Sequence, residues 1–114
     1  MWVSLSEAFF SIVAIPNKPD MLIVRARRRG DIERYFPDIE VEATPGRDYY
    51  FRAEISRMAV AEIIATNIQK IQYDNFKNSV SDDNLHAAYS KVWTTMSKLQ
   101  VVPPYSANHR KQYP

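Results

Sequence analysis

The spacing of apolar residues changes near residue 56, and this change limits most strongly what the chain can fold into. Before it, apolar and polar residues alternate in short runs such as residues 21–27 and 49–55. Alternation with a period of two is typical of strands with one buried face. After it, apolar residues recur at spacings of three and four, which is the pattern of an amphipathic helix. In the first such helix they are Val60, Ile63, Ile64, Ile68 and Ile71. The chain is therefore predicted to be an α+β protein.

Four strands and three helices are predicted. The strands are residues 2–14 (with a bulge or bend at Glu7 and Ala8), 21–27, 39–43 and 49–55, and the helices are residues 31–36, 57–71 and 82–99. The order is ββαββα followed by one more helix. Moving the last strand of a ferredoxin-like βαββαβ order to the front gives ββαββα. We therefore predict a four-stranded, mostly antiparallel sheet with helices on one face, in a permuted ferredoxin-like arrangement. The sequence leaves open whether the last helix covers the sheet, packs beside the other helices or serves a partner chain.

Length and composition fit one folded domain. The chain has 114 residues, and we expect a single domain over residues 1–100 with a proline-containing, flexible tail over residues 101–114. Fifteen Lys and Arg against 13 Asp and Glu give a net charge of +2, too small to indicate nucleic-acid binding by itself. Cysteine is absent, which excludes disulfides and thiolate metal sites. With only 2 glycines, a glycine-rich phosphate loop is excluded as well.

We do not expect the N-terminal residues to form a secretion signal. The segment from Met1 onward has no basic region, and Ser4, Ser6 and Glu7 interrupt its apolar run. No apolar stretch approaches the ~20 residues that cross a bilayer. We therefore expect a soluble, cytoplasmic protein without a membrane partner.

Arginine and tyrosine would share one face of the predicted sheet if its second and fourth strands are neighbours. Arg25 and Arg27 alternate on the second strand, and Arg52 and Tyr50 alternate on the fourth. Proteins that bind single-stranded nucleic acid combine such groups, because guanidinium pairs with phosphate and an aromatic ring stacks on a base. We favour the other interpretation, an ordinary solvated face on which Glu54 and Glu42 neutralise the arginines, because the net charge is low and the aromatic motif of RNA-binding RRM sheets is absent from the sequence.

A second group of aromatic and polar residues surrounds the junction between the last two helices. It consists of Tyr73, Asn75, Phe76, Lys77, His86, Tyr89 and Trp93. As a pocket, it would offer His86 as a general base and Lys77 as an anion ligand. As a structural hinge, it would use Phe76 and Trp93 to fill apolar volume and Asn75 to hold the loop. We favour the hinge, because a single histidine without a clear partner is rarely catalytic.

Other chemistry is not indicated. The two histidines, His86 and His109, lie in a helix and in the tail, so we predict no metal site. No carboxylates have acid–base spacing, and no serine has the sequence context of a nucleophile elbow. We expect no cofactor and no catalytic residue, although an enzyme is not excluded.

Several short segments resemble a family of small uncharacterised bacterial proteins. They are Trp2-Val3, Val24-Arg25-Ala26-Arg27, Thr44-Pro45-Gly46-Arg47-Asp48-Tyr49, Tyr73-Asp74-Asn75-Phe76-Lys77, and His86 with Tyr89, Val92, Trp93 and Met96. The resemblance covers most of residues 1–97. It implies a compact, stand-alone domain and no particular activity.

Four functions remain as hypotheses. The first is a non-enzymatic interaction domain that forms a homodimer, because the apolar first strand, two tryptophans and the last helix offer more apolar surface than one thin sheet needs. The second is a nucleic-acid-binding module that uses the arginine face. The third is an enzyme with His86 and Lys77 in a small cleft. The fourth is a phage-encoded inhibitor of a host complex, which the small size and the lack of a catalytic motif would fit.

Overall fold

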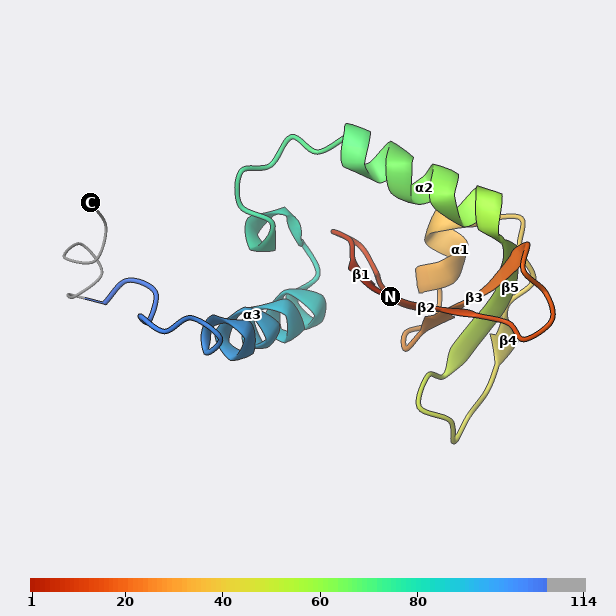
Figure 1. Ribbon diagram of the computed structural model, residues 1–114, viewed down its shortest axis with the longest axis horizontal. Helices are drawn as coiled ribbons and strands as arrows, with labels where there is room; N and C mark the ends of the chain where they lie inside the picture. Colours follow the sequence, from red (N-terminus) through yellow and green to blue (C-terminus); the bar gives the residue numbers. More distant parts are fainter. Residues whose placement is uncertain (107–114) are drawn as a thin grey trace. The chain divides into compact units, whose positions relative to one another are not determined.

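A computed structural model describes residues 1–106 of the chain (Figure 1). The chain divides into two compact units, residues 1–74 and residues from Asn75 onward. The first holds β1 (Trp2–Ser4), β2 (Phe9–Ala14), β3 (Met21–Ala26), α1 (Asp31–Tyr35), β4 (Glu42–Ala43), β5 (Phe51–Ser56) and α2 (Arg57–Gln69). The second holds the 3-10 helix η1 (Lys77–Ser79) and α3 (Asp83–Ser97). The predicted α+β class is confirmed. Of the predicted tail, residues 107–114, which include His109, lie outside the described residues.

The sheet has five strands in the order β1-β2-β3-β5-β4, and all neighbours are antiparallel. The prediction of four strands was wrong, because residues 2–14 do not form one strand. The chain turns back at residues 5–8, where the Leu5 N–H donates to the Ala8 carbonyl at 2.9 Å. Trp2 then lies opposite Ser11 and Val3 opposite Phe10. The interruption at Glu7 and Ala8 is thus a hairpin turn rather than a bulge.

Strand β5 separates β3 from β4. Both neighbours are antiparallel to β5, so β3 and β4 run in the same direction, and α1 lies in the connection between them. The short β4 is an edge strand, as its alternating acidic sequence predicts.

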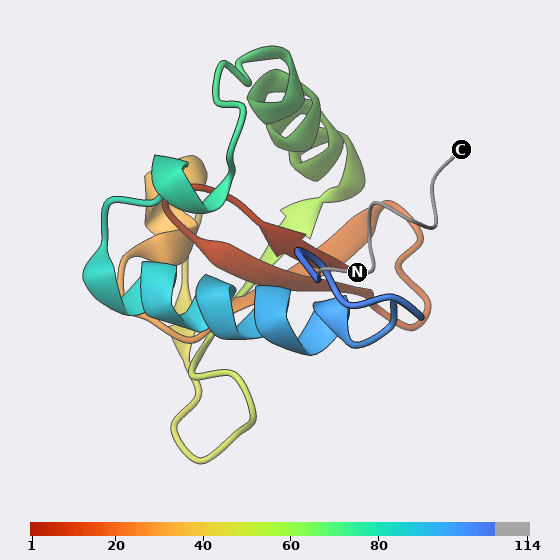
Figure 2. The same ribbon diagram turned by 90° about the vertical axis from the view of Figure 1, so that its left-hand side faces the viewer.

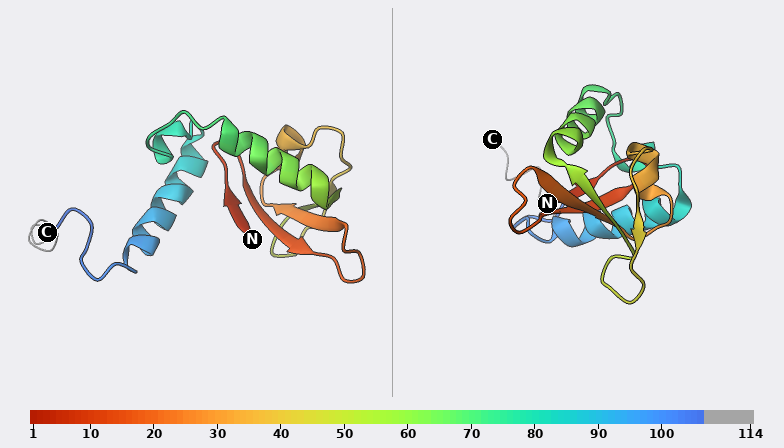
Figure 3. Two further views of the ribbon diagram at one scale, coloured as in Figure 1. Left: turned by 45° about the horizontal axis from the view of Figure 1, so that its top comes forward. Right: turned by 90° about the vertical axis from the view of Figure 1, so that its right-hand side faces the viewer.

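One face of the sheet carries the core of the first unit. Helices α1 and α2 cover this face (Figures 1 and 3). The buried side chains are Ala8, Phe10, Ile12, Val24, Ala26, Ile32, Phe36, Phe51, Ala53, Ile55 and Val60. Burying one large apolar side chain such as Phe10 contributes roughly 1.5–3 kcal/mol. Helix α2 begins where Ser56 Oγ accepts a hydrogen bond from the Ala59 N–H at 3.1 Å.

The second unit is built around α3, which Figure 2 shows along its length with η1 before it. Asp82 caps the helix, since its carboxylate accepts a hydrogen bond from the Leu85 N–H at 2.8 Å. Leu85 and Tyr89 are buried on the first half of the helix. The ring of Phe76 lies 5.2 Å from the ring of Tyr89. Phe76, in the segment before α3, therefore covers Tyr89, which is one of the two buried residues of the helix.

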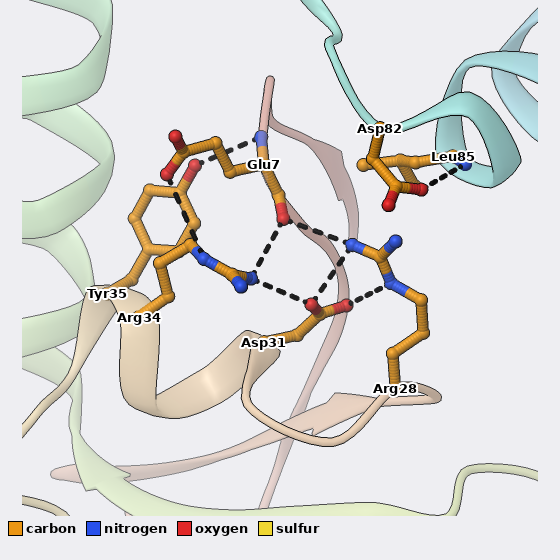
Figure 4. A network of polar contacts seen from close by, with 7 residues as sticks. All are labelled: Glu7, Arg28, Asp31, Arg34, Tyr35, Asp82 and Leu85. Carbon is orange, nitrogen blue, oxygen red and sulfur yellow. Dashed lines mark hydrogen bonds and ion pairs between the residues drawn. The ribbon is translucent and has the colours of Figure 1, made fainter.

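A buried carboxylate ties the β1–β2 turn to α1 (Figure 4). Asp31 is 3% exposed and accepts hydrogen bonds from Arg28 at 3.0 and 3.1 Å and from Arg34 at 3.0 Å. Both arginines also donate to the Glu7 carbonyl at 3.2 Å. The Glu7 N–H in turn donates to the Tyr35 hydroxyl at 3.3 Å. Burial raises the pKa of that phenol above its ordinary value. The turn is thus held by both polar groups of the Glu7 backbone.

Replacing this carboxylate should destabilise the fold. In Asp31→Ala, Arg28 and Arg34 lose their shared acceptor while still contacting the turn. We expect the free energy of unfolding, measured by urea denaturation, to fall by roughly 2–3 kcal/mol, because hydrogen bonds to a buried charge are lost. The matched control is Glu33→Ala, an exposed acid on the same helix, which should change stability by less than about 0.5 kcal/mol. Equal losses in the two variants would show that the network contributes nothing.

Candidate interaction surfaces

Two arginines face each other on the side of the sheet that α1 and α2 leave uncovered. Arg25 and Arg52 are directly opposite residues of β3 and β5. Their side chains are only 17% and 12% exposed. Asp48 lies beside both, with its carboxylate 2.8 Å from Arg52 and 3.9 Å from Arg25. Arg25 also donates to Ser11 Oγ at 2.5 Å. Two like charges across a strand pair are destabilising, so Asp48 is the group that compensates them.

The aromatic partner of the arginines is Tyr49. The guanidinium groups of Arg25 and Arg27 lie 4.6 and 4.0 Å from the centre of its buried ring. Tyr50, which the sequence placed with them, is half exposed and contacts the Phe51 ring at 4.7 Å. The strand predicted for residues 49–55 begins only at Phe51. The ring that lies against the guanidinium groups is therefore that of Tyr49 and not that of Tyr50.

These contacts compete with a nucleic acid for the same groups. The guanidinium of Arg52 is bonded to Asp48, and that of Arg25 to Ser11. A phosphate would have to displace the carboxylate. Glu54, expected to neutralise an arginine, instead pairs with Lys18 at 2.8 Å. Glu42 lies opposite Arg52 in the ladder. Binding of nucleic acid by Arg25, Arg27, Arg52 and Tyr50 stays a prediction.

The role assigned to Asp48 can be tested by stability. In Asp48→Ala, Arg25 and Arg52 would face each other without an anion. We expect the free energy of unfolding to fall by about 1 kcal/mol at low salt, because the carboxylate is largely exposed and the pairing is partly screened. The loss should shrink at high salt, which screens the repulsion between the arginines.

The matched control is Asp38→Ala. Asp38 is exposed and makes no ion pair within residues 1–106. Its removal should leave both stability and its salt dependence unchanged. A salt-independent loss in Asp48→Ala would contradict the electrostatic explanation.

The residues around the junction of the second unit make structural contacts. Asn75 accepts a hydrogen bond from the Asn78 N–H at 3.3 Å, which holds the turn of η1. The ammonium group of Lys77 lies 4.6 Å from the centre of the Trp93 ring. Tyr89 is buried against Phe76, and His86 is half buried one turn before it. The structure thus brings Lys77 to Trp93 and Phe76 to Tyr89. These contacts suit a hinge, and a catalytic use of His86 stays a prediction.

The second half of α3 and the turn that follows it, which contains Leu99, carry exposed apolar side chains. Leu85, Tyr89, Val92, Met96 and Leu99 follow one another at alternating spacings of four and three. The first two are buried, whereas Val92, Met96 and Leu99 are 53%, 57% and 77% exposed. We call these three residues the α3 stripe. Beside it, Trp93 and Tyr105 stack at 6.3 Å between ring centres and border a hollow of about 460 Å³. The spacing of these five residues is visible in the sequence, but it does not show that the first two are covered and the last three exposed.

Comparison with known proteins adds no family. No protein-family model, no curated protein and no solved structure matches the chain. Within residues 1–106, no three His, Asp or Glu side chains are grouped so that they could hold a metal ion. The same part of the chain contains no helix long and apolar enough to cross a membrane.

Proposed function

We propose that this protein is a non-enzymatic interaction domain that forms a homodimer through the α3 stripe. The observation that carries the proposal is the exposure of Val92, Met96 and Leu99 at alternating spacings of four and three. This is the spacing by which two α-helices pack side by side with interlocking side chains. A stripe of this kind left in water marks a contact surface.

A second copy of the same helix is the partner that this spacing fits best. A two-fold axis places the same patch on both sides of a dimer interface, so a stripe of uniform chemistry is self-complementary. The stripe itself contains no charged side chain that would repel its copy. Trp93, on its flank, adds the kind of large aromatic group that often dominates interface energies.

We also propose that the sheet has a permuted ferredoxin-like arrangement of strands. The order β2-β3-β5-β4 supports a permuted ferredoxin-like arrangement to which β1 is added at one edge. The position of β5 between β3 and β4, with α1 in their connection, fits the split βαβ unit of that fold. In this proposal the first unit is a scaffold and the second unit carries the dimer contact.

Charges placed in the stripe should dissociate the dimer. In the double variant Val92→Glu with Met96→Glu, carboxylates would be brought into an apolar contact and would repel those of the other copy. We expect the dimer dissociation constant, measured by sedimentation equilibrium of the full chain, to rise by at least about tenfold. Both positions are exposed, so the helix should form as before.

The matched control is Ala87→Glu with Thr94→Glu. Both residues are exposed and lie on the side of α3 opposite the stripe, so this variant adds the same charge elsewhere. The control should dimerise as the wild type does. A wild-type chain that stays monomeric at high concentration, or equal weakening in both double variants, would overturn the proposal.

A further inference from the structure

Strand β1 has hydrogen-bonding groups that the sheet does not use. It is the outermost strand, and it pairs with β2 (Figure 3). The Ile12 N–H donates to the Met1 carbonyl at 2.8 Å, and the Leu5 N–H donates to the Ala8 carbonyl at 2.9 Å. Bonded residues alternate along an antiparallel strand, so Val3 also faces β2. The N–H and C=O groups of Trp2 and Ser4 therefore point away from the sheet.

β1 is short, at three residues, but its side chains give no protection against strand addition. Natural sheets protect their edges with charged side chains, proline or bulges. β1 has the sequence Trp-Val-Ser, without charge or proline, and Trp2 is 75% exposed. The opposite edge, β4, is only two residues long and carries Glu42.

An apolar groove runs beside the same edge. A cavity of about 640 Å³ lies between β1 and the C-terminal half of α2. The strand side contributes Val3, Ser4 and Leu5, and the helix side contributes Ile64, Ile68 and Ile71. Ile68 is 62% exposed although it lies one turn after Ile64, which packs on the core. The exposed backbone edge and an apolar floor are thus next to each other.

The charge of the groove limits what can occupy it. Among residues 1–106, Lys70 is the one charged residue that lines it, and no acidic side chain of this part of the chain does so. We propose that the groove binds an extended peptide segment of a partner protein, which adds as a strand to β1. Its alternate apolar side chains would lie over Ile68 and Ile71, and an acidic residue or a free C-terminal carboxylate would pair with Lys70. In this mode of binding, called strand addition, main-chain hydrogen bonds provide the affinity and alternate side chains provide the specificity. It is independent of the α3 stripe.

The probe is a library of random seven-residue peptides that end in a free carboxylate, selected on the full chain. Enriched sequences should be apolar at alternate positions and acidic at or near the C-terminus. The most enriched peptide is then synthesised, and its dissociation constant is measured by titration. In spectra of the isotope-labelled chain, the amide signals of Trp2 and Ser4 should shift on binding. A library without enriched sequences would overturn the proposal.

Two variants remove the proposed contacts without touching the core. Ser4→Pro deletes an outward N–H and leaves the bonds to β2 in place, as proline is tolerated on an edge strand. Ile68→Glu places a charge on the floor of the groove. Each should weaken peptide binding by at least about tenfold. Met58→Glu is the matched control, because Met58 is equally exposed on α2 but does not line the groove. Its peptide affinity should equal that of the wild type.

Two further outcomes would show that the groove binds a second copy of the chain or that the peptide binds at another place. If the Trp2 amide signal shifts when the chain alone is concentrated, and Ser4→Pro, which has no amide signal of its own at residue 4, removes that Trp2 shift, the occupant is a second copy of β1 and the partner-peptide proposal fails. If peptide binding survives both Ser4→Pro and Ile68→Glu, the peptide binds elsewhere and the proposal also fails. The dimer test on the α3 stripe is not affected by either variant, so the two proposals can fail separately.

Discussion

The buried ion cluster around Asp31 is the interaction on which the arrangement of the first unit depends. An unpaired carboxylate with 3% exposure would be costly, and here it is neutralised by Arg28 and Arg34 together. The same arginines bind the Glu7 carbonyl, which fixes the tight turn between β1 and β2. Because that turn is fixed, the N-terminal residues fold back as an added edge strand instead of extending β2. The groove beside α2 exists only because β1 is held there.

The polar groups of this protein are mostly used to support structure. Arg25 and Arg52, which look like ligand-binding residues in the sequence, are occupied by Asp48, Ser11 and the Tyr49 ring. Lys77 lies over Trp93, and Asn75 closes a turn. Two apolar surfaces are exposed, the groove beside β1 in the first unit and the α3 stripe in the second. The proposed protein contacts are placed on these two surfaces.

Sequence patterns predicted local structure well and missed what depends on distant contacts. Alternation in residues 21–27 and the spacing of apolar residues in α2 and α3 located these elements, because each pattern reports one buried face. The fold-back at residues 5–8 was missed, since it depends on arginines about twenty or more residues away. Tyr49 rather than Tyr50 lies beside the arginines, because the alternation of side chains along β5 does not extend before its first residue, Phe51. No pattern in the sequence predicted the groove beside β1, because its lining combines residues 3–6 with residues at the end of α2, which are far apart in the chain.

The proposed association of two copies of the chain through α3 is tested most directly by a distance measured between the copies. The chain contains no cysteine, so Lys98→Cys provides a single labelling site. Lys98 lies at the end of α3, away from the stripe, and a spin label there should not disturb the contact. Pulsed dipolar spectroscopy of the labelled full chain should give one narrow distance, which disappears when Val92→Glu and Met96→Glu are added. The absence of any dipolar signal at the highest soluble concentration, or a distance that survives both substitutions, would contradict the account.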